Sequence, residues 1–140
     1  MFPKDVSLER LNKLSKNTLV EHLGIEIIEI NKDSLKGKMP VDNRTRQPLG
    51  LLHGGASVVL AETLGSIAAT MTLDLNKQYA VGLEINANHI RSAKEGEVIG
   101  MATPIHVGGK TQVWEIKISD EDDRLICISR ITMAILDKKS

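Results

Sequence analysis

Apolar residues run almost without interruption through the middle of the chain, from Gly50 to Thr72. This stretch reads GLLHGGASVVLAETLGSIAATMT, and from Gly54 onward it is rich in Ala, Leu, Ile and Val. The run is long enough for roughly five helical turns, and Ala and Leu favour a helix. Because the segment is apolar on nearly every side, we expect a long central helix that is buried all round.

One carboxylate, Glu62, interrupts this apolar segment. An ionised carboxylate is costly in such a place unless it is paired, hydrogen-bonded or shifted in pKa. Gly65 and Ser66 follow three and four residues later on the same side of the predicted helix, and their small side chains leave room for a ligand or water. Glu62 is therefore the first candidate for a chemical role.

Two other interpretations of the central stretch stay open. A membrane span has the right length, but the Glu within it, the adjacent His-Gly pair and the many small residues argue against it. Alternatively, Glu62 lies at a helix edge and pairs with a surface cation. The small polar neighbours favour a ligand-facing carboxylate over that structural role.

Before the central helix, the pattern predicts two short helices and a hairpin. Apolar positions three residues apart follow Ser7, which is suited to cap a short amphipathic helix, and Thr18 is suited to cap a further turn before Gly24. The segment IEIIEI then predicts a strand, NKDS a turn, and residues 35–39 a second strand. The segment 40–52, with two prolines, is expected to be irregular.

After the helix, alternation with a period of two predicts long strands. In AVGLEINANHIRSA one face is expected to hold Val81, Leu83, Ile85 and Ala87, and the other Gly82, Glu84, Asn86 and Asn88. Further strands are expected at 96–106 and in QVWEIKIS, where Trp114, Ile116 and Ile118 face inward, with a turn at 108–110 between them.

The last predicted strand, LICISRITMAIL, is apolar on both faces apart from Ser129, Arg130 and Thr132. Such a strand is expected to be covered on both faces, by the central helix on one and by a second subunit on the other. The elements together predict an α+β fold in which one antiparallel sheet of five or six strands encloses a long helix.

Composition narrows the functional class. A chain of 140 residues is expected to form one domain, residues 1–140, and is small for an enzyme that encloses a substrate alone, so oligomerisation is expected. Eighteen basic and eighteen acidic residues cancel, and the absence of a basic run argues against nucleic acid. The single cysteine, Cys127, excludes an internal disulfide or Cys-cluster metal site and is expected to be a small buried residue. The N-terminus lacks the apolar core of a signal peptide, so a cytoplasmic location is expected.

The order of elements, together with the segments QPLGLLHGGASVVLAETLGS and GLEINANHIRSA, resembles the hotdog-fold acyl-CoA thioesterases. Within that family it is most similar to the subgroup acting on aromatic acyl-CoA, which includes the dihydroxynaphthoyl-CoA thioesterases of menaquinone biosynthesis and the proofreading thioesterases of enterobactin synthesis. The resemblance extends from about Ser7 to Leu136. It implies a homodimer that forms the active site, a homotetramer, and hydrolysis of an aromatic or medium-chain acyl-CoA.

Thioester hydrolysis needs a group that polarises the carbonyl and a group that activates water. The N-terminus of the predicted helix offers free N–H groups, and either Gly54 or Gly55 permits close approach. The resemblance selects Gly54, and it implies supporting roles for Gln47, His53 and Ser66. Because eight residues of helix span about 12 Å, Glu62 cannot reach a carbonyl bound at Gly54 of its own chain. The resemblance implies that Glu62 of one subunit meets the Gly54 end of its partner, as general base or as nucleophile.

The resemblance also implies contacts to coenzyme A, which enters as part of the substrate; no other cofactor and no metal are expected. The implied CoA-binding residues are Gly82, His89, Ile90, Arg91, Ser92, His106, Val107, Gly108, Gly109, Lys110 and Thr111. Many relatives carry arginine in the second stretch, where this chain has Gly109 and Lys110, and lysine lacks the bidentate fork of arginine.

Two other functions stay open at this stage. A hotdog dehydratase would need a histidine and a carboxylate converging on its substrate, and the predicted helix carries no histidine near Glu62. A non-catalytic acyl-CoA-binding protein would bind CoA esters without turnover.

Overall fold

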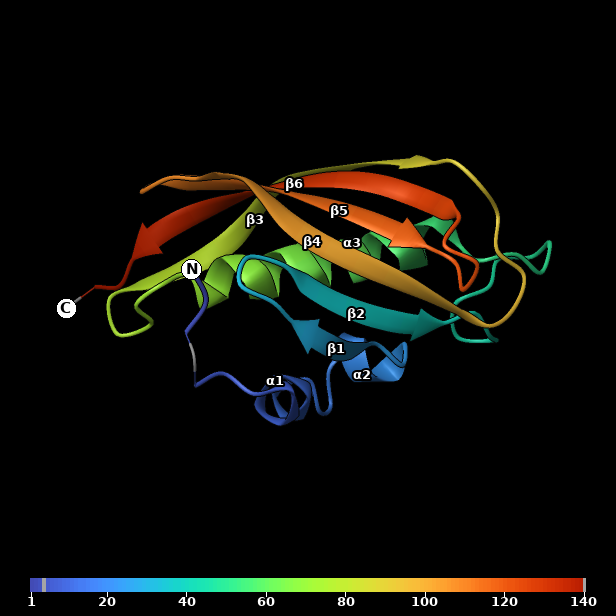
Figure 1. Cartoon of the computed structure of the whole chain (residues 1–140), viewed down its shortest axis with the longest axis horizontal. Coiled ribbons are helices and arrows are strands. Elements are labelled where there is room, and N and C mark those ends of the chain that lie inside the picture. The colour runs from blue at the N-terminus through green and yellow to red at the C-terminus, as the bar shows by residue number, and fades with distance from the viewer. Residues whose placement is uncertain (4, 140) are drawn as a thin grey trace.

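The computed structural model describes residues 1–3 and 5–139 and contains a six-stranded sheet wrapped around one long helix (Figure 1). The elements, in chain order, are α1 (Leu8–Leu14), α2 (Leu19–His22), β1 (Glu26–Ile30), β2 (Leu35–Pro40), α3 (Gly54–Met71), β3 (Gln78–His89), β4 (Glu97–Val107), β5 (Thr111–Ser119) and β6 (Leu125–Asp137). This order confirms the predicted α+β hotdog arrangement.

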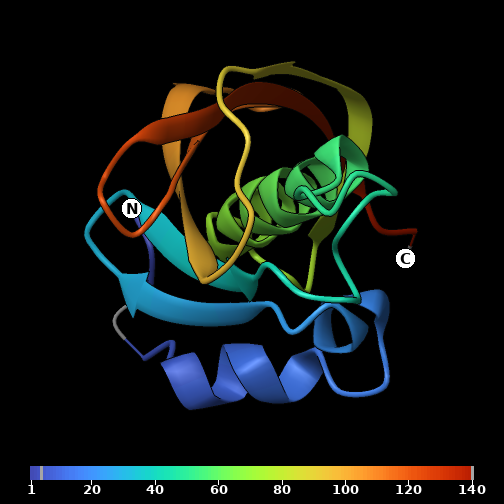
Figure 2. The ribbon, with the colours of Figure 1, turned by 90° about the vertical axis from the view of Figure 1, so that its right-hand side faces the viewer.

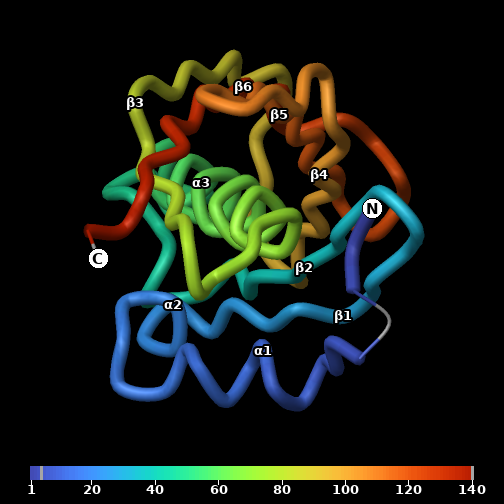
Figure 3. The backbone as a smooth tube through the Cα atoms, turned by 90° about the vertical axis from the view of Figure 1, so that its left-hand side faces the viewer, coloured from blue at the N-terminus to red at the C-terminus, as the bar shows by residue number. Residues whose placement is uncertain are grey.

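The sheet is antiparallel throughout, with strand order β1-β2-β4-β5-β6-β3. Figure 2 shows it curving around α3, with α1 and α2 beyond β1. Figure 3 gives the view from the opposite end and shows the same layers. The two edges of the sheet, β1 and β3, therefore come round toward each other with α3 between them.

The short N-terminal helices form as predicted, with one difference. Ser7 caps α1, because its hydroxyl accepts a hydrogen bond from the Arg10 N–H at 3.1 Å. Thr18 precedes α2 but its side chain makes no cap; it donates instead to the Ser15 carbonyl at 2.6 Å. The chain leaves α2 through Gly24, whose φ of +73° suits glycine.

A bulge in β3 makes the predicted assignment of its faces wrong. Gly82 pairs with Met133 and Glu84 with Thr132, so Leu83 is the extra residue between them. One inserted residue moves every following side chain to the other face. The inward residues are therefore Ala80 and Gly82 before the bulge and Ile85, Ala87 and His89 after it, which lie opposite inward positions of β6. Val81 and Leu83 are exposed.

The prediction that the central helix is buried on every side is also wrong for the single chain. α3 buries a stripe that includes Leu60, Leu64 and Ala68 against the sheet, whereas Glu62 on the other side is exposed. α3 has the length and composition of a membrane span, but half of its residues are buried inside the domain, as in a core helix.

β5 and β6 supply much of the core. Trp114, Ile116 and Ile118 are fully buried, as predicted, and Cys127 is a buried free thiol whose pKa is raised by burial. The second face of β6 is not covered in the single chain: Arg130 is exposed and Leu136 is 40% exposed. The predicted cover by a second subunit stays a prediction.

Candidate functional site

The N-terminus of α3 is organised by His53. Its Nδ1 accepts a hydrogen bond from the Gly55 N–H at 2.8 Å, so the neutral imidazole carries its proton on Nε2. Among the described residues, nothing accepts a hydrogen bond from the Gly54 N–H. The sequence alone did not decide whether Gly54 or Gly55 supplies the N–H donor. In the structure Gly54 has the free N–H, at the positive end of the helix dipole.

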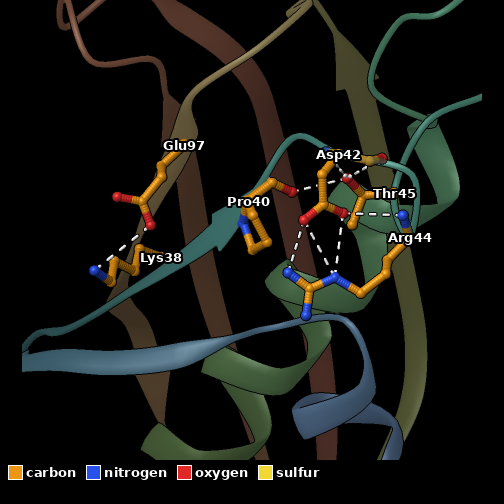
Figure 4. Close-up of polar contacts among 6 residues, drawn as sticks. All are labelled: Lys38, Pro40, Asp42, Arg44, Thr45 and Glu97. Atoms are coloured by element: carbon orange, nitrogen blue, oxygen red, sulfur yellow. Dashed lines mark hydrogen bonds and ion pairs between the residues drawn. The ribbon is translucent and has the colours of Figure 1, made fainter.

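The loop before α3 is held by Thr45, which is 1% exposed. Its hydroxyl donates to the Pro40 carbonyl at 2.8 Å and accepts from the Asp42 N–H at 3.1 Å (Figure 4). Its carbonyl accepts from the His53 N–H at 2.8 Å. The Arg44 guanidinium contacts the Asp42 carboxylate at 2.7 Å and lowers the pKa of that carboxyl. One buried threonine thus links the end of β2 to the first residue of the helix cap.

Gln47 lies at the end of this loop and is half-buried. Its side-chain oxygen accepts from the Leu49 N–H, and its backbone N–H donates to the Leu51 carbonyl at 2.8 Å. Because the oxygen is occupied, the amide NH2 is the group that Gln47 can offer to a ligand.

A cavity of about 280 Å³ gathers many of the predicted residues at this end of the helix. The residues that line it are Gln47, Leu51, Leu52, Gly54, Ser57, His89, Ile90, Arg91, Ser92, Ala93 and Ile126. The His89 ring sits directly on α3: a Cβ at Gly54 would lie 2.8 Å from its Nε2. A side chain at position 54 would therefore force the imidazole to move.

Glu62 lines a second cavity of about 490 Å³ on the open side of α3. The expected burial of its carboxylate is not observed in the single chain. Across the described residues no cation lies within 4.0 Å of it, so the surface ion pair considered from the sequence is absent. Its Oε2 lies against β3, 2.9 Å from where a Cβ at Gly82 would stand. Gly82 therefore makes room for the carboxylate.

Ser66 lies one turn after Glu62 and lines the same cavity. Its hydroxyl contacts the Met133 sulfur at 3.9 Å. Among the described residues no hydrogen bond joins the Ser66 and Glu62 side chains, and the supporting role expected for Ser66 stays a prediction.

The two predicted CoA-binding stretches lie at opposite ends of the sheet. His89 is opposite Cys127, which pairs with Ile118 near the end of β5. Thr111, at the start of β5, pairs with Ala134 near the end of β6. The hairpin that carries His106, Val107, Gly108, Gly109, Lys110 and Thr111 is thus remote from residues 89–92 within one chain.

One chain therefore divides the predicted site between two cavities, with Gln47 and Gly54 in one and Glu62 in the other.

Sequence reasoning missed Thr45. This residue lies in the polar run DNRTRQ, residues 42–47, within the segment that was expected to be irregular. In the part of the chain that the structure describes, no three His, Cys, Asp or Glu side chains cluster as metal ligands would.

Comparison with known proteins identifies the family of this chain. A family model described as the thioesterase superfamily matches residues 49–127. The 1,4-dihydroxy-2-naphthoyl-CoA hydrolase of Escherichia coli K12 is 52% identical over 136 residues, which are 97% of this chain and 99% of that protein. The proofreading thioesterase EntH of Cronobacter turicensis is 49% identical over 136 residues, covering 97% and 98%. A Pseudomonas aeruginosa thioesterase, solved as a variant with one glutamine replaced by alanine, has a TM-score of 0.96 at 47% identity and covers 98% of this chain and 99% of that chain.

Proposed function

Because this chain belongs to the thioesterase superfamily and is a thioester hydrolase of the hotdog fold, we propose that it cleaves acyl-CoA thioesters into a free acid and CoA. The observation that carries the proposal is the arrangement along α3. Among the described residues, nothing accepts a hydrogen bond from the N–H of its first residue, Gly54, and no cation lies within 4.0 Å of the Glu62 carboxylate, which lines a cavity two turns later.

The N-terminus of α3 is suited to polarise the thioester. The Gly54 N–H would donate to the carbonyl oxygen, where negative charge develops as the carbonyl is attacked. The Gln47 NH2 and the His53 Nε2–H are further donors, since the other polar atom of each side chain is already engaged. Donors fixed in this way need little reorganisation during the reaction.

Glu62 would supply the base or the nucleophile. As a base it would take a proton from water while the water oxygen bonds to the carbonyl carbon, and the CoA sulfur would leave and take up a proton. As a nucleophile it would first form a mixed anhydride, which water would hydrolyse. Both routes consume one water and release the same acid and thiol.

The two halves of the site would meet across a homodimer. Glu62 and Gly54 are about 12 Å apart along one helix, too far to act on one carbonyl. β3 is an edge strand with unpaired backbone groups, which suits it to pair with a second copy. An antiparallel pair of β3 strands would bring the 106–111 hairpin of one subunit toward residues 89–92 of the other. The two remote CoA-binding stretches would then hold one CoA, with Arg91 and Lys110 as phosphate contacts.

Subunit complementation tests this arrangement. Glu62→Ala and Gln47→Ala homodimers should each be nearly inactive in a thiol-release assay. A co-expressed, doubly tagged heterodimer should regain close to half of the wild-type rate, because one of its two sites has both residues intact. A heterodimer as slow as its parents would refute a shared site, and full activity of Glu62→Ala would refute the catalytic role of Glu62.

The substrate belongs to the proposal as well. We infer an aromatic acyl-CoA such as 1,4-dihydroxy-2-naphthoyl-CoA or a benzoyl-type ester, or a medium-chain ester. The name of the Escherichia coli relative supports the first, and with it a place in menaquinone biosynthesis. Relative kcat/KM over a panel of CoA esters decides among them; binding without release of free CoA would instead indicate a non-catalytic protein.

The proposal also covers the oligomeric state, the cellular location and the need for a metal or cofactor. We infer a homotetramer made of two such dimers, in the cytoplasm, acting without metal or cofactor beyond the CoA of its substrate. Sedimentation, cell fractionation and an assay in EDTA test these three points. Loss of activity in EDTA would contradict the metal-free mechanism.

A further inference from the structure

Two adjoining cavities separate the N-terminal helices from α3. The first, of about 490 Å³, has Glu62 in its wall, and the second, of about 340 Å³, continues along α3 to Thr70 and Met71. Leu11, Leu14, Ser66 and Ile67 line both. The space beside the carboxylate thus extends along the helix for more than a turn.

The N-terminal wall of this space is mainly apolar and incompletely covered, although Ser15 and Thr18 also line the first cavity and Asp5 and Arg10 the second. Leu14 of α1 is 71% exposed, and Leu19 of α2, which lines the first cavity, is 57% exposed. Single exposed leucines are common on protein surfaces. Here, however, both belong to a cavity that also contains the only carboxylate of α3.

α1 is fixed in place by a two-point contact with the sheet. The Asn12 amide donates to the Ile27 carbonyl at 3.0 Å, and its oxygen accepts from the Ile27 N–H at 2.8 Å. Because β1 is an edge strand, these backbone groups have no neighbouring strand to pair with. Leu11, the residue directly before Asn12, is 9% exposed and packs in the core. α1 is therefore an ordered wall.

We propose that the apolar face of α1 receives the acyl group of the substrate, and that Leu14, where the two cavities join, determines how long an acyl group is accepted. This inference rests on the proposed function. It names the substrate class as CoA esters whose acyl part has an extended apolar body, longer than a single ring, because the second cavity continues the first in line with α3.

The test compares substitutions at Leu14 with the same substitutions at Leu8. Leu8 is a 37% exposed leucine of the same helix that lines neither cavity. Acetyl-, hexanoyl-, decanoyl- and benzoyl-CoA are assayed with wild type, Leu14→Trp, Leu14→Ala and the matched Leu8→Trp and Leu8→Ala variants. Both positions are exposed, so the variants should fold; melting temperature and sedimentation are measured for each.

We expect Leu14→Trp to raise KM for decanoyl-CoA at least tenfold while kcat/KM for acetyl-CoA stays within about twofold. Leu14→Ala should lower the preference for hexanoyl- over decanoyl-CoA, and both Leu8 variants should keep the wild-type profile. If the Leu14 and Leu8 variants share one chain-length profile, this inference fails while the hydrolase assignment stands. If wild type cleaves neither these esters nor 1,4-dihydroxy-2-naphthoyl-CoA, the proposed function fails instead. A changed subunit number in Leu14→Trp would show that a second copy covers Leu14, which also overturns the inference.

Discussion

Gly82→Ala tests the placement of the Glu62 carboxylate. A Cβ at position 82 would lie 2.9 Å from Glu62 Oε2, whereas ordinary van der Waals contact begins at 3.4 Å. The carboxylate must therefore withdraw by about half an ångström or more. The nearest atom outside Glu62 is Ile131 Cδ1 at 4.0 Å, which is ordinary contact. The methyl group consequently moves a flexible acid and leaves the core untouched.

A displacement of this size is expected to slow the reaction without weakening the fold. Misplacing a reacting group by about 1 Å can cost about a hundredfold in rate. We expect kcat to fall by about tenfold to a hundredfold, roughly 1.4 to 2.7 kcal/mol in the barrier, with KM little changed. The melting temperature should hold or rise slightly, since glycine weakens a strand interior.

The assay is thiol release from a CoA ester, with Val81→Ala on the outward face of β3 as the matched control. A double-mutant cycle with Glu62→Ala isolates the contact. Gly82→Ala should slow wild type but leave the residual rate of Glu62→Ala unchanged. Wild-type kcat in Gly82→Ala, or an equal slowing in the Glu62→Ala background, would refute the reasoning.

Three further predictions concern the other cavity and its loop. Thr45→Val removes the hydroxyl that bonds Pro40 and Asp42 and should lower kcat/KM at least tenfold, whereas Thr45→Ser should restore most of it; equal rates in both variants would contradict a positioning role. Gly54→Ala keeps the backbone N–H but would place a Cβ 2.8 Å from His89 Nε2, and it should abolish most turnover with the fold retained by circular dichroism; an unaffected rate would contradict the need for a residue without a Cβ at the start of α3. Arg44 lowers the pKa of Asp42 from its usual 3.8, so the ionised carboxylate stabilises the folded state above that pH, and this contribution is lost as pH falls through the lowered value. The difference in melting temperature between wild type and Asp42→Asn should therefore be full at pH 6, begin to shrink as pH falls below about 3.8 and vanish below the lowered pKa; a difference that does not change between pH 6 and pH 2 would contradict the ion pair as its cause.

Local patterns were sufficient to predict the elements and the family. The apolar run after Gly54 predicted α3, Ser7 predicted the start of α1, and alternation predicted the long strands. These features depend on residues within a few positions of one another, and helix and strand periods are themselves local properties. The spacing from the HGG segment to Glu62 is likewise readable along the chain, and it supported the resemblance that the comparisons confirmed.

Only the tertiary structure decided which residues share a cavity. A one-residue bulge at Leu83 turned Gly82 toward Glu62, and no local pattern marks where a partner strand accommodates an extra residue. His89, at the end of β3, lies against Gly54, at the start of α3. This contact joins residues far apart in sequence, so the sequence pattern does not predict it. The single chain also left Glu62 exposed, since the burial of a helix depends on what packs against each face, and here one face has no strand over it. Hydrophobic pattern thus determined the elements, while strand register and long-range packing determined the site.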